Sequence, residues 1–192
     1  MKKIKSEISA ELLNINDALN LFTGKSFKVF FKLIEESKSK INKKKIIFCG
    51  NGGSASHAQH LACELVVRYS KNRTAINALS LTTDTSNITA IGNDYNFEYI
   101  FSRQLEAVGN KGDICIFLTT SGESKNILNA AKVAKKKLIS CYSFSGKGGG
   151  KLKKIIKNNI IIDSTSTSVI QTCHLILGHI YCKEIENFIS KK

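Results

Sequence analysis

Apolar residues recur along the chain in two patterns that alternate with each other. Short, predominantly apolar runs, typical of strands that are buried on both faces, occupy five segments: residues 46–49, 76–81, 113–118, 138–144 and 160–162. Segments with the spacing of amphipathic helices lie between them. Because strands that alternate with helices form a parallel sheet covered on both faces, we expect an α/β fold with a doubly wound, five-stranded sheet.

Helical patterns also lie outside the alternating part of the chain. Two amphipathic helices are predicted before the first strand, at residues 4–21 and 26–40, and a long helix is predicted at residues 167–189. The apolar stripe of the first helix must be covered by other residues. We therefore expect a single domain, in which residues 1–42 form a helical packing or oligomer segment and residues 43–192 form the α/β core.

Composition places the chain among cytosolic globular proteins. No apolar run is long enough to span a bilayer, and the N-terminal segment has two acidic residues where a signal peptide would be apolar. The six cysteines show no C-x-x-C pairing and lie in apolar contexts, so we expect buried thiols in a reducing compartment. They are Cys49, Cys63, Cys115, Cys141, Cys173 and Cys182.

The net charge of +14 raises the question of a nucleic-acid partner, because basic surfaces attract phosphate backbones without sequence preference. The lysines are spread over several separate segments, without interleaved aromatic residues or a recognisable nucleic-acid motif. We interpret most of them as solvated helix faces. We expect neither a nucleic acid nor a membrane as a partner.

The stretch at residues 45–69 predicts a strand, a glycine turn and a helix. Gly50, Gly52 and Gly53 follow the first strand, and glycines let backbone N–H groups approach an anionic ligand without obstruction by a Cβ atom. Ser54 is expected to cap the helix and to offer its hydroxyl to the ligand. The N-terminus of the helix therefore faces whatever binds at this turn.

Two common nucleotide-binding motifs do not account for the glycine turn. Gly50, Gly52 and Ala55 fit the dinucleotide pattern G-x-G-x-x-G/A, but residues 66–83 lack the acidic residue expected about twenty positions further on to hold the ribose. A Walker phosphate loop fails as well, because the chain around residues 146–147 lacks the first glycine and the Ser/Thr of that motif.

Residues with ligand-binding side chains are spaced to share helix faces. His60 and Glu64 differ by only ~40° around the helix axis, so both can reach one ligand or metal ion. In the last helix, Gln171 and His179 lie ~80° apart, loosely on one side. His174 lies ~140° from His179 and is expected to be a packing or interface histidine. Spacing alone favours a core position for His179 too.

A second turn with ligand-binding character follows the third strand. Thr119, Thr120, Ser121 and Ser124 place four hydroxyls, together with Gly122, at the start of a helix. Hydroxyls and free backbone N–H groups donate hydrogen bonds, and the helix dipole favours negative charge. A merely capped turn needs one hydroxyl, so we expect this turn to bind a phosphate monoester. Both turns fall at the carboxyl ends of strands, where such sheets bind their ligands.

The residues of these motifs resemble those of the phosphoheptose isomerases, members of the sugar isomerase (SIS) domain superfamily. The resemblance covers nearly the whole chain and rests on residues 50–56, 58–62, 64, 68–69, 90–95, 101–104, 120–122, 124, 171 and 179. It implies a five-stranded parallel SIS fold and a homotetramer with active sites at subunit interfaces. It also implies conversion of sedoheptulose 7-phosphate to D-glycero-D-manno-heptose 7-phosphate, the first step toward the ADP-heptoses of bacterial surface glycans.

Carried over residue by residue, the resemblance implies three sets of site residues. One Zn²⁺ per subunit is implied, with the ligands His60, Glu64, Gln171 and His179. Sugar and phosphate contacts are implied for Asn51, Gly52, Gly53, Ser54, Glu64, Asn93, Asp94, Thr119, Thr120, Ser121, Ser124 and Gln171. Glu64 is expected to move the C1/C2 proton and His179 to shuttle a proton between the oxygens. Whether Glu64 acts as base or as metal ligand, and whether His179 carries the carbon proton, stays open.

The chain departs from the family pattern at several positions. His57 stands where family members carry Asp, Val67 where they carry Gly, and Glu123 where they carry Asn. Ser168 and Val169 stand where Asp or Ala and then Arg are usual. None of these changes removes a proposed ligand or base.

Two alternative functions are compatible with these departures. The first is a non-catalytic SIS protein similar to a bacterial replication initiator-binding tetramer, which would bind its partner through a surface. Retention of all four proposed zinc ligands argues against this function. The second is a sugar-phosphate sensor or an isomerase that acts on a different ketose phosphate.

Overall fold

A five-stranded parallel sheet forms the centre of the molecule. The structure is a computed structural model and describes residues 1–191. Its strands are β1 (Ile46–Gly50), β2 (Ala78–Ser80), β3 (Ile114–Leu118), β4 (Ser140–Ser145) and β5 (Asn158–Ile161). They lie in the order β2-β1-β3-β4-β5, and every neighbouring pair is parallel. The predicted five-stranded α/β sheet is confirmed.

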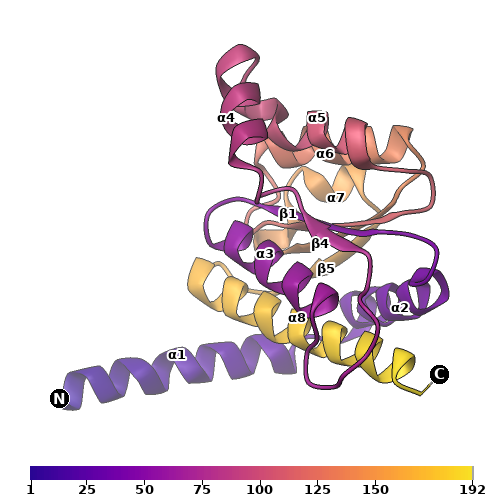
Figure 1. Ribbon diagram of the computed structural model, residues 1–192. Helices are drawn as coiled ribbons and strands as arrows, with labels where there is room; N and C mark the ends of the chain where they lie inside the picture. Colours follow the sequence, from indigo (N-terminus) through magenta and orange to yellow (C-terminus); the bar gives the residue numbers. More distant parts are fainter. Residues whose placement is uncertain (192) are drawn as a thin grey trace.

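Helices cover both faces of the sheet (Figure 1). One face carries α2 (Gly24–Lys40), α3 (Gly53–Val66) and α8 (Thr167–Ile189), and the other carries α4 (Thr85–Asp94), α5 (Ile100–Val108), α6 (Lys125–Lys136) and α7 (Leu152–Ile155). Short 3-10 turns span Phe97–Tyr99 and Lys147–Gly149. Side chains along each strand point alternately to the two faces of the sheet, so the core has two parts. Phe48 packs with residues of α3 and α8, whereas Cys49 packs with residues of α4, α5 and α6.

Helix α1 (Lys2–Asn20) packs against the body of the molecule along only part of its length (Figure 1). Ala18, with Ile15 and Leu19 beside it, contacts the core under α8. Ile4, Ile8 and Leu12 are 61%, 56% and 62% exposed. The apolar stripe predicted from the sequence therefore forms, but a single chain covers only its C-terminal end.

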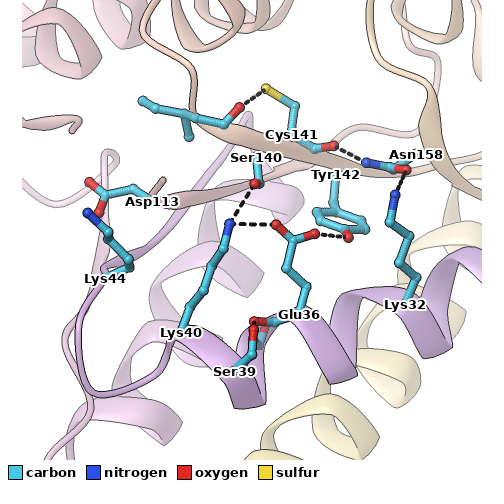
Figure 2. A network of polar contacts seen from close by, with 12 residues as sticks. Lys32, Glu36, Ser39, Lys40, Lys44, Asp113, Ser140, Cys141, Tyr142 and Asn158 are labelled. Atoms are coloured by element: carbon cyan, nitrogen blue, oxygen red, sulfur yellow. Dashed lines mark hydrogen bonds and ion pairs between the residues drawn. The ribbon is translucent and has the colours of Figure 1, made fainter. Parts of the chain in front are cut away.

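A polar network fastens α2 to the sheet (Figure 2). The Glu36 carboxylate accepts hydrogen bonds from Lys40 Nζ at 2.6 Å and from the Tyr142 hydroxyl, and Lys40 also donates to Ser140 Oγ at 2.9 Å. Burial alone would raise the pKa of Glu36, but hydrogen bonds from Lys40, Ser140 and Tyr142 outweigh it and lower that pKa. Glu36 is therefore charged at neutral pH and holds α2 on β4.

One local prediction needs correction. Cys63 is exposed, whereas the other five cysteines are buried as predicted. Helix α4 runs through Gly92, Asn93 and Asp94; Asp84 caps its start at the N–H of Asn87, and Ile91 is buried. A 3-10 turn then leads into α5.

None of the helices within residues 1–191 combines the length and the apolar character needed to cross a bilayer.

Candidate functional site

Two loops meet where the order of the strands reverses, between β1 and β3. In doubly wound sheets, ligands bind at such a switch point, beyond the carboxyl ends of the strands. A cavity of about 70 Å³ opens at this place. Its lining consists of Asn51, Ser54, Leu118, Thr119, Thr120, Ser121, Ser124 and Gln171. All of these residues except Leu118 are predicted substrate contacts, so the fold brings these parts of the prediction together.

Residues of the second turn use their hydroxyl groups to shape the turn, and they also line the cavity. Thr119 Oγ1 accepts a hydrogen bond from the Gly122 N–H at 3.1 Å, and Ser121 Oγ accepts one from the Glu123 N–H at 3.2 Å. A hydroxyl that accepts in this way keeps its own proton for donation to an anion. Ser124 precedes α6 and makes no side-chain capping hydrogen bond, so its hydroxyl is also available.

Glu123 adds a negative charge beside this turn, and Lys151 pairs with it. Glu123 Oε1 accepts from the Lys151 backbone N–H at 2.8 Å, and Oε2 lies 2.7 Å from Lys151 Nζ. The hydrogen bond from the Lys151 side chain is the main reason why the pKa of Glu123 is lowered. The carboxylate therefore ties the second turn to Lys151, which follows the glycine-rich loop at residues 146–150, and is matched by a positive charge.

The first turn approaches α8 closely because it is made of glycine. A Cβ atom on Gly53 would lie 2.8 Å from Nε2 of Gln171 and 2.9 Å from its Oε1. Ser54 is buried and lines the cavity, but Gly52, with φ of 54°, precedes α3 and no side chain caps that helix. The predicted capping role of Ser54 is therefore wrong.

Asn51 is held by a residue that sequence reasoning missed. Its side-chain amide makes two reciprocal hydrogen bonds, of 3.0 and 2.9 Å, with the amide of Asn126. Asn126 is buried in the first turn of α6, 75 positions further along the chain, and belongs to no recognisable motif. The pair fixes one wall of the cavity and joins the two turns.

Two histidines and a glutamate converge between α3 and α8. Nε2 of His60 lies 2.8 Å from Nε2 of His179 and 3.4 Å from Oε1 of Glu64. The ligand atoms of all three residues lie within 4.8 Å of one another. His179 is half-buried and contacts His60, so the core position favoured by its spacing alone is wrong. Two imidazole nitrogens and a carboxylate oxygen are ligands that Zn²⁺ prefers, so the donor set fits that ion.

Close packing of two helices produces this cluster. A Cβ atom on Gly178 would lie 2.6 Å from Cδ2 of Leu61, so only glycine lets α8 approach α3 this closely at that point. Leu61 and Gly178 are the immediate neighbours of His60 and His179. The cluster remains accessible, because the His60 side chain is 45% exposed and that of Glu64 is 21% exposed.

The other two histidines add no charge to the cluster at neutral pH. His174 packs against the ring of Phe144, and burial lowers its pKa to about 4, so the predicted packing role is confirmed. Burial, and then the charges of His60 and His179, lower the pKa of His57. His57 therefore supplies a neutral ring beside the cluster.

Asn93 and Asp94 are predicted substrate contacts that one chain does not bring to the cavity. They end α4, on the face of the sheet opposite α8, and Asn93 Nδ2 donates to Asp94 Oδ1 at 2.8 Å. Asp94 lines a separate cavity of about 280 Å³, together with Tyr95 and Arg103.

The fold and this arrangement of turns define an SIS-domain protein. Residues 32–146 match the family model described as the SIS domain. The phosphoheptose isomerase of Campylobacter concisus is 42% identical over 183 residues, which cover 95% of each chain. That of Campylobacter jejuni subsp. jejuni is 50% identical over 142 residues, which cover 74% of this chain and 76% of the relative.

A solved structure gives the same result over the whole chain. The phosphoheptose isomerase of Neisseria gonorrhoeae superposes with a TM-score of 0.87 at 32% identity and covers 97% of this chain and 98% of its own. The chain therefore belongs to the phosphoheptose isomerase family of SIS-domain proteins.

The contact between Gly53 and Gln171 leads to a prediction. Gly53→Ala places a methyl group where the Gln171 amide lies, so the amide must leave the cavity. Loss of one hydrogen bond to a charged group is expected to weaken sugar-phosphate binding about tenfold or more, as measured by calorimetry. The free energy of unfolding is expected to change by about 1 kcal/mol or less.

A double-mutant cycle checks whether Gly53→Ala weakens sugar-phosphate binding by displacing the Gln171 side chain. If it does, Gly53→Ala adds no further loss of affinity in a Gln171→Ala background. Fully additive losses would show that Gly53 acts on binding by another route.

Proposed function

We propose that the protein is a cytoplasmic phosphoheptose isomerase that converts sedoheptulose 7-phosphate to D-glycero-D-manno-heptose 7-phosphate. This reaction supplies the first intermediate of ADP-heptose synthesis for bacterial surface glycans such as lipopolysaccharide, lipooligosaccharide or capsule. The observation that carries the proposal is the convergence of His60, Glu64 and His179 beside a hydroxyl-lined cavity, in a chain whose relatives bear this name. A non-catalytic scaffold has no use for that convergence. Six unpaired cysteine thiols are compatible with a reducing cytoplasm.

The cavity and the histidine cluster supply two separate requirements of this reaction. The hydroxyls of Thr119, Thr120, Ser121 and Ser124 and the N-terminus of α6 bind the phosphate. The Cα atoms of Gln171, which lines the cavity, and of His179, which belongs to the cluster, lie about 12 Å apart along α8. An extended seven-carbon sugar with a terminal phosphate is of comparable length. Holding the phosphate therefore places the other end of the sugar at the cluster.

The reaction moves a proton between two adjacent carbons through an ene-diol. It needs a base at carbon and a group that moves a proton between the oxygens. Glu64 acts as the base for the C1/C2 proton, and His179 exchanges protons with the two oxygens. The close contact of His60 with both residues orients them toward one another.

His60, Glu64, Gln171 and His179 are the residues that would hold a Zn²⁺ ion in each subunit. When bound, the ion supplies Lewis-acid polarisation of the sugar carbonyl. The convergence of His60, Glu64 and His179 supports their assignment, since imidazole and carboxylate are preferred zinc ligands, whereas Gln171 is assigned from the family resemblance.

Removal of the Glu64 carboxylate tests the catalytic assignment. Glu64→Gln keeps the shape of the side chain but cannot accept the carbon proton, so kcat should fall by about 10³-fold. Turnover of sedoheptulose 7-phosphate is followed by NMR, and circular dichroism checks the fold. Cys63→Ala, an exposed neighbour on the same helix, is the control and should keep the full rate. A wild-type rate in Glu64→Gln would rule out Glu64 as base.

Metal binding is tested by a measurement that does not depend on enzyme activity. Purified, chelator-treated protein is expected to take up one Zn²⁺ per chain, and His60→Ala or His179→Ala should each weaken the affinity by about 100-fold or more. Calorimetry measures stoichiometry and affinity, with Cys63→Ala as a control for binding at an exposed thiol. Unchanged stoichiometry and affinity in His179→Ala would remove that residue from the ligand set.

Assembly into a homotetramer is part of the proposal. Contiguous exposed apolar residues mark interaction surfaces, and Ile4, Ile8 and Leu12 on α1 form such a surface. Active sites at subunit interfaces would let a neighbouring subunit supply Asn93 and Asp94, which one chain leaves apart from the cavity.

Light scattering tests the assembly directly. The wild type is expected to have the mass of four chains of 21.2 kDa each. The variant with both Ile8→Lys and Leu12→Lys should dissociate to smaller species, because charges replace buried apolar contacts. Lys3→Glu, on the same helix, is the control for a change of charge. A monomeric wild type at assay concentration would contradict the tetramer.

A further inference from the structure

A buried ion pair lies at the end of α3 and α8 that is remote from the cavity. Nε of Arg73 lies 3.7 Å from Oε1 of Glu186, and the two side chains are only 2% and 1% exposed. A buried ion pair is weak evidence for stability, because the cost of removing two charges from water offsets their attraction. Its contacts with the surrounding backbone show what it holds in place.

Glu186 is the acceptor for a whole turn of backbone. Its carboxylate accepts hydrogen bonds from the N–H groups of Tyr69, Ser70 and Lys71 at 2.8, 2.8 and 3.0 Å, and from the Ser70 hydroxyl at 2.9 Å. Burial alone would raise the pKa of Glu186, but these donors outweigh it and lower that pKa. The carboxylate therefore stays charged and fixes the segment that follows α3.

Arg73 reaches back from the same segment to the catalytic helix. Its Nη2 donates to the backbone carbonyl of Glu64 at 2.7 Å, and its Nη1 donates to the carbonyl of Thr74 at 2.9 Å. The guanidinium thus connects Glu186 on α8 with the backbone of the proposed base on α3.

A second connection runs to the histidine cluster. Glu186 and His179 are seven residues apart on α8, two turns along the helix and within ~20° around its axis. The ring of Tyr69, whose backbone N–H is held by Glu186, lies 5.8 Å from the ring of His179. One buried carboxylate therefore controls contacts to both proposed catalytic residues.

We propose that Arg73 and Glu186 are positioning residues that fix the Glu64 backbone and the Tyr69 ring relative to His179. This role rests on the proposed isomerase function. Neither residue touches the substrate. They set the distance between base and imidazole, which the reaction requires to be accurate because a displacement of ~1 Å can cost about 10²-fold in rate.

The chain contains a matched control for the simpler view that the pair only stabilises the fold. Asp113 is 1% exposed, accepts from the N–H groups of Lys45 and Asn110 at 3.0 and 2.8 Å, and lies 3.2 Å from Lys45 Nζ. It immediately precedes β3, so it lies at the amino end of the sheet, opposite the cavity. Asp113→Asn removes a comparable buried carboxylate far from the site.

The test compares Glu186→Gln with Asp113→Asn, at a temperature well below both melting points. Glu186→Gln should lower kcat by about tenfold or more, with KM changed by less than about threefold. Asp113→Asn should lower the melting temperature by a similar amount but leave kcat within about twofold of wild type. If Glu186→Gln does not fold, Arg73→Lys takes its place, since it keeps the charge but loses the forked contact to the Glu64 carbonyl.

A spectroscopic measurement separates this inference from the proposed function. The chain has four histidines, so histidine labelled with ¹³C gives a simple imidazole spectrum. The signals of His60 and His179 should shift in Glu186→Gln and stay in place in Asp113→Asn. If the wild type lacks isomerase activity, the proposed function fails, and these spectra alone decide the positioning role. Unchanged His179 signals in Glu186→Gln, or equal losses of kcat in both variants, would overturn the inference.

Discussion

The contact between α3 and α8 at Gly178 is the constraint on which the site depends. Without a Cβ atom at this point, the helices approach until Leu61 fills the space that a side chain would occupy. His60 and His179, 119 positions apart in sequence, are then only 2.8 Å apart. Residues so far apart in the sequence meet only because the two helices pack together, so the cluster of His60, Glu64 and His179 is a product of helix packing.

The same two helices also connect the cluster with the hydroxyl-lined cavity. At their N-terminal ends, Gly53 meets Gln171; at the cluster, Leu61 meets Gly178; and at the far end the segment after α3 meets Glu186. The residue numbers rise in the same direction along both helices in these contacts, so α3 and α8 run in parallel. Each helix carries a residue that lines the cavity, Ser54 or Gln171, and a histidine of the cluster, His60 or His179. The packing of the two helices therefore sets the distance between the cavity and the cluster.

Features encoded locally could be predicted from the sequence. The predominantly apolar runs predicted the five strands, because a strand buried on both faces carries few polar side chains. Each of the two turns, and the pairing of His60 with Glu64, follows from short spacings within a single stretch of the sequence. The resemblance to a known family added His179 and Gln171, whereas the spacing of His179 alone favoured a core position.

Features that depend on distant contacts could not be predicted. Asn126 belongs to no motif and is recognisable only by its amide contacts with Asn51. Arg73 and Glu186 look like solvated charges in the sequence, yet the fold buries both. Cys63 lies in an apolar run but on the outer side of α3, so it is exposed. Which side of a helix is outer depends on the packing of α8, which the local sequence does not contain.

Solvent proton exchange during turnover tests the central claim most directly, because an ene-diol reaction passes the carbon proton through an exchangeable group on the protein. Sedoheptulose 7-phosphate is incubated with the wild-type protein in D₂O, with and without zinc, and followed by NMR. We predict that D-glycero-D-manno-heptose 7-phosphate appears with deuterium at C2. If neither the aldose nor deuterium exchange is detected in either experiment, with zinc and without it, the assignment of a catalytic site to the space between α3 and α8 is contradicted.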